Sequence, residues 1–359
     1  MDLAAPGGYQ KAAMMKAGFC PTSNLQSRRK AAGLWLMLVA LVILVMVMVG
    51  GLTRLTGSGL SITEWQPIMG AIPPLTDAAW AEAFEKYKLI PQFQQVNSDM
   101  TLAGFKEIFW WEWSHRFLGR FLGFLFFVPF CWFAATGVIA RKEWPRMLLL
   151  FALGAFQGLI GWWMVKSGLE TRVTVSQYRL AIHLGAAIIL LGAILWTALD
   201  YLRPGRAGWA PKLAIGFIGL IYFQILLGAL VAGLHAGLIY NTWPDMNGAF
   251  VPQEAFFYSP WWRNFFENPA LAQFDHRMTA YALAALTIAI YANALKQGPG
   301  KAKLSGKLAT VAVTLQIFLG IVTLVYRAPL PLSAMHQFLA ALLFCLAIWH
   351  AHELRRPAA

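Results

Sequence analysis

Four of the seven histidines lie near the starts of long apolar stretches, at comparable positions. They are His115, His183, His276 and His336. A single histidine at such a place is usually a packing or interfacial residue. Four at matched positions favour a ligand role, because two imidazoles that face each other inside an apolar four-helix bundle can hold a haem iron. Zinc is a weaker interpretation, since no third or fourth ligand at suitable spacing accompanies either pair.

A carboxyl group accompanies only one of the four histidines. Glu112 lies three residues before His115, on the same helical face and one turn toward the outside. The equivalent residue before His276 is Gln273, which cannot ionise. A carboxyl that is partly buried at such a place could act as a general acid or base. We therefore expect proton-coupled chemistry at the first histidine pair, with Glu112 as the catalytic residue, and haem binding or electron transfer alone at the second.

Arginines lie at or near the outer ends of the same apolar stretches. Arg54, Arg116 and Arg277 are candidates for binding or positioning haem propionates, since guanidinium groups pair well with carboxylates. Each one taken alone is more often an anchor in the lipid headgroups. Arg116 or Arg120 could also pair with Glu112, and such a pairing is compatible with a catalytic role.

The composition is that of a polytopic membrane protein. Of the 359 residues, 58% are hydrophobic and 13% are charged, against about a quarter charged in soluble proteins. Eight apolar segments approach or exceed the length of about 20 residues that spans a bilayer. They are residues 34–52, 113–140, 147–166, 178–201, 211–235, 274–295, 307–326 and 332–352. We predict an all-α polytopic membrane protein with eight transmembrane helices.

The basic residues predict the orientation of these spans. Both tails and the connections after the second, fourth and sixth spans are rich in Lys and Arg, and all fall on one side of the membrane. That side is cytoplasmic by the positive-inside rule, which accounts for the net charge of +13 better than nucleic-acid binding does. We expect a bacterial inner membrane with both termini in the cytoplasm; the mitochondrial inner membrane is the alternative. His350 and His352, on this side, are expected to be ordinary interfacial residues.

The chain contains an internal repeat. Residues 59–71 align without gaps to residues 237–249, sharing glycine, leucine, tryptophan, glycine and alanine. The histidines follow in the same order in both halves, as do Gln157 and Gln316, which are expected to form hydrogen bonds between helices. Each half has four spans, so the repeats share one orientation and their pseudo-twofold axis runs along the membrane normal.

The repeat divides the chain into four parts. An N-terminal tail, residues 1–33, precedes a first four-helix half, residues 34–205. A second four-helix half, residues 206–352, is followed by a C-terminal tail, residues 353–359. We expect two pseudo-symmetric four-helix bundles related as a parallel repeat.

Two surface helices are expected in the first long connection. Thr76 predicts a capped amphipathic helix over residues 78–88. Ser98 and Asp99 predict a second helix that leads into the aromatic run at residues 109–111.

Three motifs resemble the signatures of the haem A synthase family. They are Gly-Gly-Leu-Thr-Arg-Leu-Thr-Gly-Ser-Gly-Leu-Ser at residues 50–61, Glu-Trp-Ser-His-Arg at residues 112–116 and Phe-Asp-His-Arg at residues 274–277. The likeness extends from about residue 33 to residue 352. It implies eight transmembrane helices in two similar halves, and oxidation of the ring methyl at position eight of haem O to a formyl group, which gives haem A for cytochrome oxidase. The reaction implied proceeds by successive hydroxylations, with oxygen taken from water.

The resemblance also implies roles for individual residues. His115 and His183 would be the axial pair of the catalytic half, where haem O binds as substrate, with Glu112 as its acid. His276 and His336 would ligate a haem b cofactor in the second half. Some members carry a cysteine pair in an outer loop. This chain has none there and so is similar to the cysteine-free proteobacterial and mitochondrial branch.

The expected partners follow from the same features. They are haem O, membrane lipid and the haem O synthase (a farnesyltransferase) that makes the substrate, whereas the electron acceptor is not indicated. Faces of small residues on the helices are compatible with a homo-oligomer.

Two other functions are compatible with parts of the sequence. A dihaem b-type protein would only transfer electrons, and Glu112 together with the family resemblance is what separates the enzyme from it. A transporter with parallel repeats would have broken helices and polar residues near the bilayer midplane. Here the ionisable residues gather at the outer rim, which disfavours transport.

Overall fold

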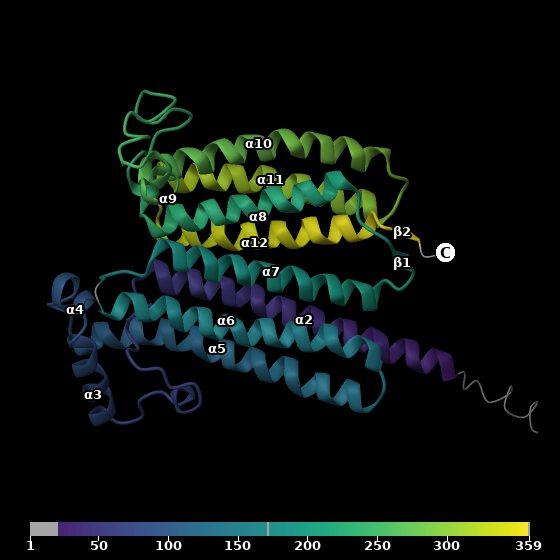
Figure 1. Cartoon of the computed structure of the whole chain (residues 1–359), viewed down its shortest axis with the longest axis horizontal. Coiled ribbons are helices and arrows are strands. Elements are labelled where there is room, and N and C mark those ends of the chain that lie inside the picture. Colours follow the sequence, from purple (N-terminus) through teal and green to yellow (C-terminus); the bar gives the residue numbers. More distant parts are fainter. Residues whose placement is uncertain (1–20, 171, 358–359) are drawn as a thin grey trace, which may run out of the picture.

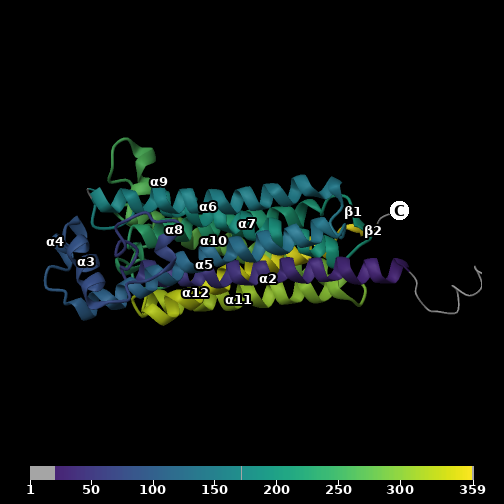
Figure 2. The same ribbon diagram turned by 90° about the horizontal axis from the view of Figure 1, so that it is seen from below.

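The computed structural model describes residues 21–170 and 172–357, and eight helices in that part of the chain are long and apolar enough to cross a membrane. They run side by side (Figures 1 and 2). Their bounds are α2 (Pro21–Leu55), α5 (Leu102–Ala135), α6 (Trp144–Glu170), α7 (Gln177–Leu202), α8 (Lys212–Gly233), α10 (Pro269–Lys296), α11 (Lys301–Val325) and α12 (Leu330–Glu353). The predicted all-α fold with eight spans is confirmed. The first helix begins at Pro21, well ahead of the apolar segment.

The helices pack in two groups that follow the chain. In the first half, α2 and α6 each contact both α5 and α7; in the second half, α8 and α11 each contact both α10 and α12. The two groups lie on opposite sides of the molecule in Figure 1 and meet through α2, α7, α8 and α12. The two pseudo-symmetric four-helix bundles and their axis along the membrane normal stay predictions.

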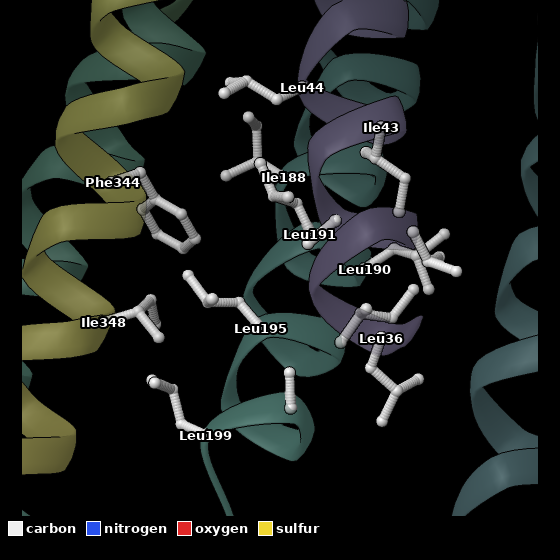
Figure 3. Close-up of a cluster of buried hydrophobic side chains, with 14 of the residues drawn as sticks. Leu36, Ile43, Leu44, Ile188, Leu190, Leu191, Leu195, Leu199, Phe344 and Ile348 are labelled. Atoms are coloured by element: carbon white, nitrogen blue, oxygen red, sulfur yellow. The ribbon is translucent and has the colours of Figure 1, made fainter. Parts of the chain in front are cut away.

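The largest apolar cluster lies where the halves meet. Side chains from α2, α7 and α12 interlock there, among them Leu36, Ile188 and Phe344 (Figure 3). Phe344 rests on Gly192, where an added Cβ would lie 2.9 Å from the ring. Lipid tails are as apolar as leucine, so association of helices in a bilayer depends on such close packing rather than on the hydrophobic effect.

A polar contact also crosses this boundary. Gln337 on α12 donates from Nε2 to the carbonyl of Val47 on α2 at 2.7 Å. Its carboxamide occupies the space beside Gly51, where an added Cβ would overlap it. The residue that follows His336 is thereby anchored in the first half.

Short helices and loops gather at one end of the bundle. Between α2 and α5 lie η1 (Met69–Ala71), α3 (Asp77–Lys88) and α4 (Pro91–Val96), and between α8 and α10 lie η3 (Ala236–Leu238), η4 (Trp261–Arg263) and α9 (Asn264–Glu267). The cap predicted for α3 is confirmed, since Thr76 Oγ1 accepts from the amide of Ala79 at 3.2 Å. We call this end the loop end.

The helix expected after Ser98 and Asp99 is not a separate element. Helix α5 begins at Leu102, after Thr101 as its cap, and continues without a break for 34 residues. Its first turns bury Phe105 and Phe109 against the aromatic side chains of α3, so the helix has a packed face well outside the apolar span.

The opposite end carries the connection η2 (Arg141–Glu143) and the antiparallel pair of β1 (Arg206–Ala207) with β2 (Arg356–Pro357). The expectation that His350 and His352 are interfacial was wrong, because both are fully buried. His352 Nε2 lies 3.0 Å from a carboxylate oxygen of Asp200, and His350 Nδ1 lies 3.0 Å from Ser305 Oγ. The strand pair and these contacts hold the end of α12 against α7 and α11.

Candidate functional site

The first two histidines face each other across the first half. His115 projects from α5 and His183 from α7, and their ring centroids are 6.5 Å apart with an angle of 76° between the planes. A metal–imidazole bond is about 2 Å long and the ring centre lies about 1 Å beyond the nitrogen, so two imidazoles on one metal have centroids about 6 Å apart. The pair therefore has the spacing of two axial ligands.

The other two histidines repeat this geometry in the second half. His276 on α10 and His336 on α12 have ring centroids 6.4 Å apart and an angle of 74° between the planes. The two pairs agree closely in both measures. In the described part of the chain, no group of three or more His, Cys, Asp or Glu side chains could hold a metal ion.

Each of the four imidazoles lies against a glycine of a neighbouring helix. A Cβ added at Gly50 on α2 would come within 2.9 Å of His115, and one added at Gly161 on α6 within 3.2 Å of His183. In the second half the corresponding glycines are Gly228 against His276 at 3.2 Å and Gly320 against His336 at 2.9 Å. These glycines let the backbones approach closely enough to fix the rings.

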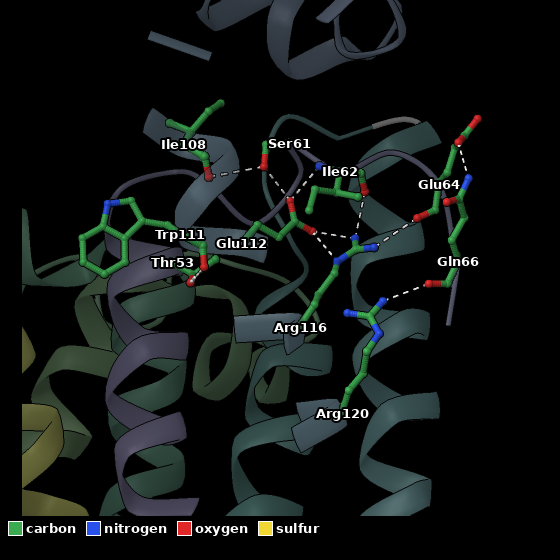
Figure 4. Close-up of polar contacts among 10 residues, drawn as sticks. All are labelled: Thr53, Ser61, Ile62, Glu64, Gln66, Ile108, Trp111, Glu112, Arg116 and Arg120. Carbon is green, nitrogen blue, oxygen red and sulfur yellow. Dashed lines mark hydrogen bonds and ion pairs between the residues drawn. The ribbon is translucent and has the colours of Figure 1, made fainter. Parts of the chain in front are cut away.

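Glu112 is held by four hydrogen bonds beside the first pair (Figure 4). Its carboxylate is 2% exposed. Oε2 accepts from Ser61 Oγ and from the amide of Ile62, each at 2.8 Å. Oε1 accepts from Nη2 and Nε of Arg116 at 2.6 and 3.1 Å. All four bonds are donated to the carboxyl, as an ionised carboxylate requires, and its partner is Arg116 rather than Arg120.

Arg116 also fixes the loop that follows α2. It donates to the carbonyls of Ile62 at 2.8 Å and Glu64 at 3.0 Å, and Arg120 donates to the carbonyl of Gln66 (Figure 4). Arg120 also donates to the carbonyl of Pro67. A hollow of ≈ 240 Å³ lies over this point, lined by the loop, Trp113 and both arginines. The hollow is thus lined by Ser61, Ile62 and Arg116, the three residues that donate hydrogen bonds to Glu112.

The second half builds the same support with an amide in place of the acid. Gln273 is 2% exposed and donates to the carbonyl of Tyr240 at 3.1 Å. Arg277 donates to the carbonyls of Tyr240 and Thr242 at 3.0 Å and of Asp245 at 2.8 Å. The loop over each histidine pair is therefore held by an arginine one residue after the first histidine.

The three predicted arginines have different surroundings. Arg116 divides its four hydrogen bonds equally between Glu112 and two loop carbonyls, and three of the four from Arg277 go to loop carbonyls. The buried Nε of Arg277 and Nη1 of Arg120 have no hydrogen-bond partner among the described residues. Arg54 reaches into the other half, where it donates to the carbonyl of Ala232 and lies 3.1 Å from His235 Nε2. Burial and the nearby guanidinium of Arg54 hold the pKa of His235 below its ordinary value.

Glu64, a further acid of the loop after α2, pairs with a lysine instead of lying in the hydrogen-bond network of Glu112. Its carboxylate pairs with Lys86 on α3 at 2.8 Å and is about half exposed, with 46% of the side chain accessible. The hydrogen bonds that Lys86 donates to Glu64 and Glu82 raise the pKa of Lys86 above its ordinary value. Glu64 contributes to the site through its backbone carbonyl alone.

Glutamine residues brace the second pair but not the first. Gln224 on α8 donates to the carbonyl of His276 at 2.9 Å, and Gln316 on α11 donates to that of His336 at 3.0 Å. The predicted interhelical hydrogen bond is confirmed for Gln316. For Gln157 the structure shows a buried Oε1 without a partner among the described residues. Gln224 escaped the sequence analysis because its counterpart in the repeat is a methionine.

Both pairs pass the tests that a haem would impose. The imidazoles are spaced as two ligands of one iron would be, and glycines leave room for the rings. Donors without partners, on Trp113, Arg120 and Arg277, lie at the loop end, where propionates could accept from them.

The chain is similar to known proteins along most of its length. The family model described as COX15-CtaA, cytochrome oxidase assembly protein, matches residues 33–348. A protein of Parvibaculum lavamentivorans named Heme A synthase is 51% identical over 327 residues, which are 90% of this chain and 94% of that protein. Heme A synthases of Rhodopseudomonas palustris strain TIE-1 and Brucella anthropi are each 49% identical, over 90% of this chain and 89% and 91% of their own lengths. The chain belongs to the COX15-CtaA family of cytochrome oxidase assembly proteins.

Proposed function

We propose that this chain is a haem A synthase, an oxidoreductase that converts the ring methyl at position eight of haem O to a formyl group by successive hydroxylations. Relatives that share about half of its residues over most of its length carry that name. The observation that carries the proposal is the contrast between two histidine pairs of equal geometry, of which only the first lies one helical turn from a buried carboxylate.

The residues of the first half fit a substrate site. His115 and His183 would bind haem O through its iron. Hydroxylation of a methyl group with oxygen from water releases protons and electrons, so the site needs a proton acceptor. Glu112 is placed for that role, since Ser61 and Arg116 fix its carboxylate and also line a hollow that can admit water.

The residues of the second half fit a resident cofactor. His276 and His336 would hold a haem b, which supplies one-electron transfer when bound. Gln224 and Gln316 fix the backbone of both ligands, and Gln273 cannot exchange a proton as Glu112 can. Arg54, Arg116 and Arg277 would position propionates, Arg116 and Arg277 chiefly through the loops they hold.

The setting proposed is a bacterial inner membrane with both termini in the cytoplasm. The eight apolar helices and the bacterial relatives support a multi-pass membrane protein. The loop end then faces outward, with both histidine pairs near it. The first half would receive haem O, directly or from the haem O synthase.

The second candidate function is that of a dihaem b-type electron-transfer protein. The near identity of the two histidine pairs favours it. It assigns no role to Glu112 beyond the pairing with Arg116. The two functions differ in whether the haem bound by the first half leaves it modified.

One co-expression experiment tests both functions. The chain is produced with a source of haem O, and the extracted haems are separated by chromatography. Haem A in the extract supports the synthase. Haem O and haem b without haem A, in a folded protein that binds both, would leave the electron-transfer protein as the better description.

Spectra of histidine variants test the assignment of the sites. Purified protein should show a low-spin b-type spectrum that His115→Ala retains and His276→Ala loses or strongly reduces. His235→Ala, outside both pairs, is the matched control and should retain the spectrum. A protein without any haem spectrum would contradict the ligand assignment.

A further inference from the structure

The two halves differ one and two helical turns below the histidine pairs, on the side away from the loop end. In α6, Gly158 and Gly154 precede Gly161 by three and seven residues. In α11, Ile317 and Val313 hold the same places before Gly320. Since residues spaced by three and seven share a helical face, these positions lie on the same face of the helix as the glycine that contacts the histidine.

The first half has open space at this level, and the second half is filled. A Cβ added at Gly158 would meet no atom within 4 Å, and one added at Gly154 would meet only Leu190 at 3.9 Å. In contrast, Val313 is 2% exposed and Ile317 packs against the core. On α5, a Cβ at Gly123 would also meet nothing within 4 Å, although Gly119 on the same face lies against α2.

The helices around this space are correspondingly less buried. In the most apolar stretch of α5 and of α6, 11% of the residues are buried, against 22% in the equivalent helices α10 and α11. The difference is not a general looseness of the first half, because 50% of the same stretch is buried in α2 and 44% in α7. Among the spans of the first half, α5 and α6 are therefore the ones with the fewest buried residues.

Aromatic contacts bound the open stretch at both ends. Toward the loop end, Trp65 of the loop lies against Trp162 of α6, with ring centroids 6.1 Å apart. Toward the other end, Phe127 of α5 lies against Phe151 of α6, with centroids 5.2 Å apart. Between them Gln157 has a buried Oε1 without a partner in the described chain. The stretch is apolar along its length and has one polar atom near the histidine level.

We propose that this stretch between α5 and α6 binds the isoprenoid tail of haem O, and that Val313 and Ile317 exclude such a tail from the second half. The inference rests on the proposed function and deepens it. Haem O differs from haem b by a long apolar tail, and the half assigned to haem O is the one with apolar space beside its histidines. Gly158 is exposed, so the tail can enter sideways from the bilayer.

The first experiment transfers the residues of the second half into the first. Gly154→Val and Gly158→Ile are combined, and the purified protein is titrated with haem O or with tail-free haem b while the absorbance is followed. We expect haem O to bind at least about tenfold more weakly, as added methylene groups in an apolar site cause, with haem b binding to the first half unchanged. Gly216→Val with Gly219→Ile on α8, where an added Cβ also meets nothing within 4 Å, is the matched control.

The second experiment is a gain of binding that a misfolded variant cannot mimic. Val313→Gly with Ile317→Gly, in a His115→Ala background, should let the second half take up haem O, which extraction and chromatography would detect. Unchanged haem O affinity in the first variant, equal loss of both haems there, or exclusion of haem O in the second would each overturn the proposal. Absence of haem A from wild-type protein would instead count against the proposed function.

Discussion

In both halves an equivalently placed arginine holds the loop and equivalently placed glycines contact the histidines. The first half, however, buries a carboxylate where the second half buries an amide. Glu112 and Arg116 form an ion pair that is almost fully enclosed, whereas Gln273 and Arg277 share a single longer bond. A buried ion pair is costly to desolvate and is not needed to hold the loop, as Gln273 demonstrates. The difference supports the proposal that Glu112 has a chemical role.

The histidines themselves show a second contrast. In the second half, glutamines bind the backbone carbonyls of both ligands; in the first half, a methionine and an unbonded glutamine stand in their places. A site whose histidine backbones are hydrogen-bonded and whose surroundings are closely packed suits a cofactor that stays bound. A site with fewer constraints and open space beside it suits a group that must enter and leave.

The sharpest way to break the first comparison is Glu112→Gln, which gives the first half the residue type of the second. General acid–base groups contribute about 10²–10⁴-fold to rate, so haem A formation should fall by about 100-fold or more. The b-type spectrum should be unchanged. Chromatography of extracted haems measures the first quantity, and Glu64→Gln is the matched control with an exposed carboxylate. Normal haem A in Glu112→Gln would remove this residue from the chemistry.

Arg116→Ala tests the energetic side of the same contrast. Removing one partner of a buried ion pair leaves an uncompensated charge and costs about 3–5 kcal/mol of unfolding free energy. The double variant Glu112→Gln with Arg116→Ala should be more stable than Arg116→Ala alone. Thermal unfolding in detergent gives the coupling between the two residues. Equal stability of the single and double variants would mean that Glu112 is not buried as a charge.

The glycines behind the rings provide a test that separates the two sites. Gly320→Ala places a Cβ 2.9 Å from His336 and should weaken retention of haem b several-fold, while Gly161→Ala should affect only haem O binding in the first half. Haem content after purification reports the first effect, and titration with haem O reports the second. A loss of haem b in Gly161→Ala would show that the sites are not independent.

The smallest expected effect compares the paired glutamines. Gln316→Leu removes a hydrogen bond to the carbonyl of His336 and should cost about 1 kcal/mol of stability. Gln157→Leu should cost less, because its Oε1 has no bond to lose. Unfolding midpoints of the two variants should therefore be ordered, and the reverse order would contradict the assigned hydrogen bonds.

Much of the fold could be predicted because it depends on patterns that are local in the sequence. The lengths of the apolar segments predicted the eight helices, and the matched positions of His115 and His276 predicted that these two residues lie at a similar depth in the membrane. The partners of Glu112 could not be predicted in full, since Ser61 and Ile62 reach it through a loop whose path depends on tertiary packing. The burial of His352 was missed for the same reason, because Asp200 lies far away in the sequence.

The contact between Gln337 and the backbone beside Gly51 makes the two halves of the chain dependent on each other. In the repeat, Leu184 stands where Gln337 would be and Ala229 where Gly51 would be, so the contact between them exists only once. A pair made of two copies of the first half would lack the amide of Gln337. A pair made of two copies of the second half would lack the space that Gly51 leaves for it. Separately expressed halves should accordingly associate with each other and not with copies of themselves.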